Sequence, residues 1–301
     1  MNLFNKASRK AFTMLELIFV IIILGIVSSI GAEIIAKTYS SYIAQRAVHR
    51  SSLKTELIAT QIANRLAYAI PHATIIRKPD GTKSSLESFV GDDWTILQWI
   101  GYDADSFGAN NADRKPGWNG FADLNASTVT SISTPGSNLD LSSTIMSSLG
   151  GSMATAAIFF PDEVGFNSIG YDGDPITGLT QIASATGETI GFVTGVDLTG
   201  KTIREQYKVA WTSYAIVPVK KDGVTPCANT DFPCDLVLRY DFRPWEGESY
   251  AADAKQEILA TNVSVLRFTG SGNTIRFKIC QEENIGEDFN ISTCKEKAVI
   301  R

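Results

Sequence analysis

The sequence predicts an α+β protein, in which one long N-terminal helix packs on a C-terminal antiparallel β-sheet domain. Three observations indicate this fold. An almost uncharged apolar run stands near the start of the chain, no Gly or Pro occurs from residue 32 to 70, and strand-like segments follow residue 205. The 301 residues are 44% hydrophobic and 20% charged, an ordinary globular balance. The net charge of -5 does not suggest nucleic-acid binding.

The apolar run, residues 12–32, contains one charged residue, Glu16. As a helix it would span about 31 Å, close to the ~30 Å hydrocarbon core of a bilayer. The basic residues before it predict a cytoplasmic N-terminus, with the rest of the chain across the membrane; they are Lys6, Arg9 and Lys10. A carboxylate at membrane depth costs roughly 2.5–3.5 kcal/mol, so Glu16 is expected to have a specific partner.

Two simpler interpretations of the run are a cleaved secretory signal and a plain membrane anchor. Residues 29–31 (SIG) have the small side chains of a signal cleavage site. The run is longer than the apolar region of about 7–15 residues in such signals, and Glu16 interrupts it near its start. An anchor accounts for the length and leaves the glutamate unexplained.

The residues around Glu16 resemble a known processing signal. Residues 10–16 (KAFTMLE) are similar to the N-terminal motif of type IV pilins and type II secretion pseudopilins, which a prepilin peptidase cuts on the cytoplasmic side. The resemblance implies cleavage between Ala11 and Phe12, N-methylation of Phe12, and Glu16 as the fifth mature residue. Two positions differ from the family pattern: Ala11 stands where Gly is usual, and Glu33 stands where many pilins carry a helix-kinking Pro.

The resemblance gives Glu16 a role in assembly. After cleavage the amine of Phe12 is cationic, and Glu16 of a neighbouring subunit can neutralise it as both groups leave water. Such a pair fixes the axial register of a helical stack, whereas an intramolecular pair would only neutralise the carboxylate. The resemblance implies a minor pilin or pseudopilin in the bacterial inner membrane, with a periplasmic head that later joins a pilus or pseudopilus. Its partners would be other major and minor subunits, the prepilin peptidase and the inner-membrane assembly platform.

The helix is predicted to continue to Pro71. An apolar residue recurs every four positions near its end and predicts a stripe that packs on the globular domain: Ile58, Ile62, Leu66 and Ile70. The expected organisation is a cleaved leader (1–11), the transmembrane half of the helix (12–32), its periplasmic half (33–70), and a β-rich head (71–301).

Residues 80–205 are expected to form a large insertion in the head. They are rich in Gly, Ser, Thr, Asn and Asp, and short apolar runs predict strands at 94–100, 156–160 and 190–193. A pilus-tip binding module for adhesion or DNA uptake is the alternative function, with this insertion as the contact surface. The tryptophans are expected in the core or at subunit contacts, rather than on an exposed binding face.

The C-terminal part is expected to form two hairpins and a last strand, at 207–219 with 236–242, 263–268 with 274–279, and 297–300. This order is similar to the end of J-type minor pseudopilins and W-type minor pilins. The insertion is longer than that type suggests, whereas K-type pseudopilins carry large insertions but typically lack the glutamate.

All four cysteines lie in this part, with spacings C-x6-C and C-x13-C. In an exported domain they predict two local disulfides, Cys227–Cys234 and Cys280–Cys294, out of three possible pairings. The second is expected to close a loop before the last strand. A zinc site is the alternative, but neither spacing fits the usual C-x2-4-C knuckle.

The sequence contains little to indicate catalysis, so no enzyme activity is expected. His49 and His72 are the only histidines, and neither lies in a recognisable nucleophile motif.

No cofactor is expected, and calcium is the one weak candidate ligand. Asp103 and Asp105 begin an EF-type pattern, but Arg114 stands where the bidentate acid belongs. Asp172 and Asp174 form a shorter acidic pair. Ordinary turn chemistry accounts equally for both, because Asp and Gly favour turns.

Overall fold

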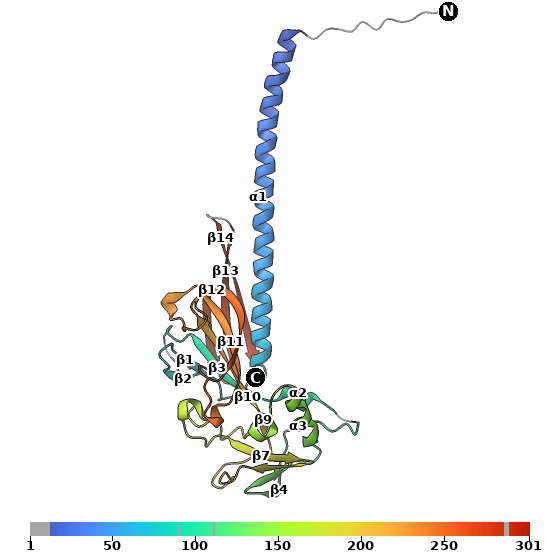
Figure 1. Cartoon of the computed structure of the whole chain (residues 1–301), viewed down its shortest axis with the longest axis vertical. Helices are drawn as coiled ribbons and strands as arrows, with labels where there is room; N and C mark the ends of the chain where they lie inside the picture. The colour runs from blue at the N-terminus through green and yellow to red at the C-terminus, as the bar shows by residue number, and fades with distance from the viewer. Residues whose placement is uncertain (1–12, 90, 111, 286–288) are drawn as a thin grey trace, which may run out of the picture.

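The computed structural model describes residues 13–89, 91–110, 112–285 and 289–301, and shows one long helix followed by two antiparallel sheets (Figure 1). The predicted α+β class is confirmed: a long apolar N-terminal helix precedes an antiparallel β-sheet domain. Figure 1 places the second sheet at the end of the molecule farthest from the start of the helix.

Helix α1 spans Met14–Leu66, 53 residues without a break. The helix ends four residues before the predicted position, because the chain turns at Ala67 to join the sheet. The Ala67 amide still donates to the Ala63 carbonyl, whereas the Ile70 amide donates to the Ile100 carbonyl in the sheet (2.9 Å). The expectation of a helix to Ile70 is therefore wrong for its last turn.

The first sheet has eight strands in the order β14-β13-β12-β11-β10-β3-β1-β2, and every neighbouring pair is antiparallel. Its strands are β1 (Ile75–Arg77), β2 (Lys83–Ser85), β3 (Ile96–Gly101), β10 (Thr212–Val219), β11 (Cys234–Phe242), β12 (Lys255–Ser271), β13 (Thr274–Ile285) and β14 (Phe289–Ile300). Two short 3-10 turns lie in its connections, η3 (Asn229–Asp231) and η4 (Pro244–Glu246).

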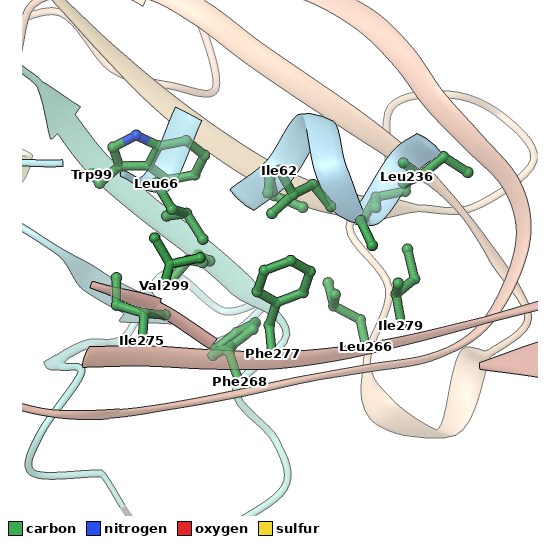
Figure 2. Close-up of a cluster of buried hydrophobic side chains, with 14 of the residues drawn as sticks. Ile62, Leu66, Trp99, Leu236, Leu266, Phe268, Ile275, Phe277, Ile279 and Val299 are labelled. Carbon is green, nitrogen blue, oxygen red and sulfur yellow. The ribbon is translucent and has the colours of Figure 1, made fainter. Parts of the chain in front are cut away.

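The main core lies between the last four turns of α1 and one face of this sheet. Ile58, Ile62 and Leu66 are 8%, 2% and 0% exposed, so the predicted apolar stripe is buried as expected. Figure 2 shows Ile62 and Leu66 facing Phe277 and other apolar side chains of β12, β13 and β14. Ile70 is also buried, but it lies beyond the helix and belongs to a separate apolar cluster.

The hairpin of β13 and β14 corrects one expectation. Cys280 and Cys294 are directly opposite partners in a continuous ladder, and do not close a loop before a short last strand. The charged residues between them hide the strand in the sequence, since only one side of this hairpin packs on α1. Lys297 and Lys295 of β14 contact Glu56 of α1 (2.6 and 3.5 Å), so polar side chains form part of that contact.

The second sheet has six strands in the order β4-β5-β8-β7-β6-β9. Its strands are β4 (Asp123–Thr128), β5 (Ser131–Ser133), β6 (Ala157–Phe159), β7 (Thr180–Thr186), β8 (Thr189–Phe192) and β9 (Lys208–Ala210). Helices α2 (Ala104–Gly108) and α3 (Leu139–Ser148) and the turns η1 (Met153–Thr155) and η2 (Tyr171–Gly173) accompany it. It has its own apolar core around Trp118, Phe160 and Ile182. The second sheet and the helices and turns that accompany it form the inserted unit. Because β2 and β3 belong to the first sheet, the inserted unit begins after Gly101.

Candidate functional site at the N-terminal helix

The first half of α1 is an apolar surface that no other part of the described chain covers. Its large hydrophobic side chains from Met14 to Ile30 are between 51% and 85% exposed. Among the helices that the structure describes, α1 alone is long and apolar enough to cross a membrane. Uncovered apolar area of this extent requires lipid or protein partners.

The start of α1 is built by Thr13 and Glu16. Thr13 is the N-cap, and its Oγ1 accepts a hydrogen bond from the Glu16 amide (3.3 Å). The carboxylate of Glu16 stands in the first turn, where the helix dipole favours negative charge. The spacing T-x-x-E is a capping-box signal, and it could have identified Thr13 as a structural residue from the sequence.

Glu16 projects from the helix among exposed apolar neighbours. Its nearest companions on the helix surface are Phe19 and Val20, three and four residues on, which are 56% and 51% exposed. No ion pair involves Glu16 within the residues that the structure describes. Ala11 and Phe12, the predicted cleavage and methylation residues, lie outside the described residues.

The middle of α1 crosses from the apolar to the polar region without a kink-forming residue. Glu33 and Lys37 form an i,i+4 ion pair (2.7 Å) on this part of the helix. Tyr39 and Tyr42 follow, and both are exposed. The helix therefore carries its apolar end away from the sheet as one continuous rod (Figure 1).

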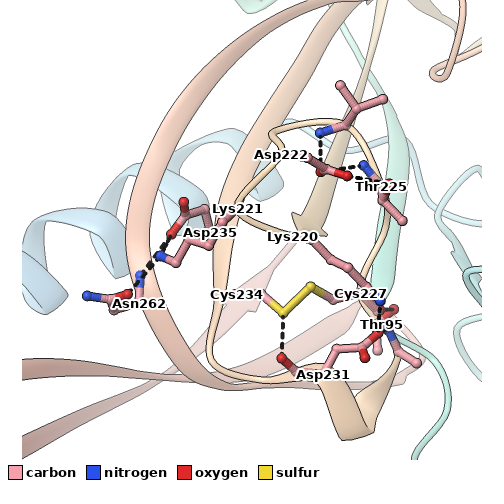
Figure 3. The surroundings of a disulfide bond; sticks show 12 residues. Thr95, Lys220, Lys221, Asp222, Thr225, Cys227, Asp231, Cys234, Asp235 and Asn262 are labelled. Atoms are coloured by element: carbon pink, nitrogen blue, oxygen red, sulfur yellow. Dashed lines mark hydrogen bonds and ion pairs between the residues drawn. A yellow bond between two sulfur atoms is a disulfide. The ribbon is translucent and has the colours of Figure 1, made fainter.

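Two disulfides brace the first sheet. Cys227, midway along the β10–β11 connection, is bonded to Cys234 at the start of β11, and Cys280 and Cys294 join β13 to β14; these are the two pairs expected from the sequence. Figure 3 shows the first bond, beside which the Thr95 hydroxyl donates to the Cys227 carbonyl (2.9 Å).

In the same connection the Thr225 hydroxyl, its amide and the Val224 amide donate to Asp222. These hydrogen bonds lower the pKa of Asp222 to about 2.

Three of the four calcium candidates serve other interactions. Asp103 caps α2 by accepting from the Ser106 amide (3.2 Å), and burial raises the pKa of the Asp103 carboxyl. Asp105 is exposed next to it. Asp172 forms an ion pair with Arg77, and Asp174 forms one with Lys83. Over the described ranges, no three His, Cys, Asp or Glu side chains gather as a metal site.

The cation that meets Asp172 is Arg77 of β1, which is only 2% exposed. Its Nη1 lies 2.5 Å from Asp172, its Nε donates to Gln98 (2.6 Å), and its guanidinium lies over the rings of Tyr171 (5.7 Å) and Tyr250 (5.2 Å). This cluster ties the η2 loop of the inserted unit to the first sheet. Sequence reasoning missed it, because 95 residues separate Arg77 from Asp172.

The remaining candidate residues are spread over the molecule. His49 is exposed on α1, and His72 lies in the turn after it with a φ of 63°. The tryptophans expected in the core are buried at three positions, Trp99, Trp118 and Trp245.

Comparison of the chain with protein-family models, with curated proteins and with solved structures finds no match. The function is therefore inferred from the residues of this chain.

Proposed function

We propose that the chain is a minor pilin or pseudopilin, a structural subunit that is processed by a prepilin peptidase and then joins, or primes, a type II secretion pseudopilus or a type IV pilus. The observation that carries the proposal is the combination of an uncovered apolar helix half with a single carboxylate, Glu16, in its first turn. The similarity of residues 10–16 to the prepilin motif supports it.

The division of α1 into two halves suits such a subunit. From Ser51 to Leu66 one face is buried against the sheet, and before that point the side chains are almost all open. A lipid bilayer covers the open half before assembly, and the helices of neighbouring subunits cover it afterwards. The basic leader gives a single-pass orientation with the N-terminus in the cytoplasm and the head in the bacterial periplasm.

Glu16 has a physical reason to select its partner. Its carboxylate costs roughly 2.5–3.5 kcal/mol at membrane depth, and pairing with the cationic amine of a neighbour's Phe12 offsets that cost only when the two helices are in register. A subunit without the carboxylate has no such preference for one axial position.

The test is the intact mass and N-terminal sequence of the protein from its native membrane, for the wild type and for Glu16→Ala. The expected wild-type chain begins at an N-methylated Phe12. Glu16→Ala is expected to be processed but to be absent from sheared filaments. Glu33→Ala is the matched control, because it removes one exposed carboxylate from the same helix and leaves Glu16 in place.

Other outcomes contradict the proposal in distinct ways. A chain that starts at Met1 indicates a plain anchor, and one that starts near Glu33 indicates a cleaved secretory signal. Normal assembly of Glu16→Ala would remove the registry role from Glu16.

A second candidate function is a binding module at a pilus tip, for adhesion or DNA uptake. It is favoured by the position of the second sheet, which forms its own core at the end of the molecule farthest from the membrane helix (Figure 1). Leu124 and Val129 on its edge are 42% and 56% exposed. Under this candidate, Leu124→Asp and Val129→Asp lower binding of the external ligand and leave assembly intact. In a pure assembly subunit, neither substitution changes ligand binding or assembly.

A further inference from the structure

The face of β12, β13 and β14 that points away from α1 carries a row of cations. The buried residues Ile275, Phe277 and Ile279 of β13 face the helix, so Arg276 and Lys278 between them face outward, and both are exposed. The register places Arg267 of β12 directly opposite Lys278. Three basic side chains therefore share one small face of a chain whose net charge is -5.

This arrangement is unfavourable for the isolated sheet, because like charges directly opposite each other in a sheet are destabilising. The guanidinium of Arg267 is occupied, since it donates to the Leu266 carbonyl and to Asn229. The side chains of Arg276 and Lys278 have neither an ion pair nor a hydrogen bond with any described residue. Glu296 of β14 stands opposite Lys278 without forming an ion pair to it. Two cations on this face therefore lack a partner.

The surface around the two cations is hollowed. A depression of about 450 Å³ is lined by Arg276 and by hydroxyl and glycine residues of the β12–β13 turn: Thr269, Gly270, Ser271 and Thr274. A second depression of about 310 Å³ adjoins it, shares Thr269 and Arg276, and extends to Lys278 and Glu296. Ala298 is the β14 partner of Arg276 and is too short to fill this space. Hydroxyl donors and two cations thus line one continuous groove.

We propose that this groove binds an acidic, extended segment of a partner protein, with one carboxylate on Arg276 and a second on Lys278. Arg276 and Lys278 are two residues apart on one strand, which sets about 6.7 Å between their backbone positions. Carboxylates two residues apart on an extended partner segment have the same spacing, so both can pair at once. The guanidinium of Arg276 presents a bidentate fork to the first carboxylate, and the hydroxyls of Thr269 and Thr274 lie in reach of the same end.

Two other anionic partners fit less well. Duplex nucleic acid is held through about 6–10 phosphate contacts in typical complexes, and this face offers two free cations on an acidic chain. Lipid headgroups are out of reach, because the groove lies near the end of α1 that is remote from its apolar half. The Arg301 amide donates to Asn273 in the β12–β13 turn, and the Arg301 guanidinium donates to Thr74, which lies beyond the end of α1. That point is about 50 Å along the helix from Ala32. The site does not depend on the filament proposal.

The test measures peptide binding to the full-length protein in nonionic detergent by fluorescence anisotropy. The probe is a labelled heptapeptide that alternates threonine with glutamate, and its match carries glutamine in place of glutamate. The wild type is expected to bind the glutamate peptide at least about tenfold more tightly, because each carboxylate adds a charge-assisted hydrogen bond. Raised salt should reduce this preference. Glu296→Gln should increase it by removing a repelling carboxylate.

The double variant Arg276→Gln/Lys278→Gln should bind both peptides equally. Both residues are exposed, so the fold should be retained, which far-ultraviolet circular dichroism checks. Arg46→Gln/Arg50→Gln on exposed turns of α1 is the matched control, since it removes the same charge elsewhere and should keep the preference. Equal binding of the two peptides by the wild type, or equal loss in both double variants, overturns the proposal. Tighter competition by inorganic phosphate than by the peptide overturns the choice of a protein segment.

Discussion

Replacing Ile62 by alanine tests how firmly α1 is held on the sheet. Ile62 is 2% exposed in the cluster shared by α1 and β12–β14. The substitution removes three buried carbons, worth about 0.8 kcal/mol each in transfer free energy. The space left behind adds about 1–2 kcal/mol when the neighbours relax only partly. The free energy of unfolding of the head is therefore expected to fall by about 4 kcal/mol, near the upper part of the range for such substitutions.

The assay is urea unfolding of the full-length protein in nonionic detergent, followed by tryptophan fluorescence, because Trp99 lies in the same cluster. With a slope of about 2–2.5 kcal/mol/M, the midpoint should fall by about 1.5–2 M. Leu57→Ala is the matched control on the same helix: Leu57 is 63% exposed, so its loss should change stability by less than about 0.5 kcal/mol. Equal midpoint shifts for Ile62→Ala and Leu57→Ala would refute the packing of this helix face.

Three further predictions concern groups elsewhere in the head. Asp172→Asn removes the carboxylate beside buried Arg77. Because Asp172 is 43% exposed, solvent screening limits the expected loss in the free energy of unfolding to about 1–2 kcal/mol, measured by urea unfolding. An unchanged free energy of unfolding would show that Arg77 is held by Gln98 and the tyrosine rings alone. Burial raises the pKa of Asp103 in the folded state, so its contribution to stability is most favourable at low pH and is lost as pH rises through the folded pKa. Asp103→Asn should therefore raise the thermal midpoint at neutral pH and raise it less in acid, and a larger gain in acid would contradict this sign. Cys280→Ser/Cys294→Ser should cost about 2–3 kcal/mol, since the bond closes a short loop. Full reduction should lower the urea midpoint of the wild type by more than that of the variant, because the variant keeps only the Cys227–Cys234 bond.

The sequence reveals those parts of the fold that follow from local periodicity. The apolar stripe of Ile58, Ile62 and Leu66 needs only the helical repeat to be recognised, and the hairpin of β12 and β13 needs only alternation and a glycine-rich turn. The far half of β13–β14 is not recognisable as strands in the sequence, because its charged residues show no apolar alternation. Its strand character arises from pairing along the whole hairpin, and Glu283 in this half contacts Lys54 of α1.

The rest depends on contacts between distant residues. The order of the second sheet, in which β6 pairs with β9, joins residues about fifty positions apart, and no local signal specifies such a partner. Asp172 and Asp174 are a weak calcium candidate in the sequence, but the cations that contact them, Arg77 and Lys83, come from the first sheet. At the candidate site the sequence indicated Glu16, and the structure adds its capping partner Thr13.

The way α1 lies along β13 and β14 has a mechanical consequence. The buried contacts run from Ser51 to Leu66, parallel to the helix axis, on strands that follow the same direction (Figure 1). A force that pulls the helix along its axis loads all these contacts together in shear, whereas a sideways force would peel them apart one turn at a time. The Cys280–Cys294 bond keeps the two receiving strands from sliding past each other. The head is thus attached to α1 most strongly against a pull along the helix axis.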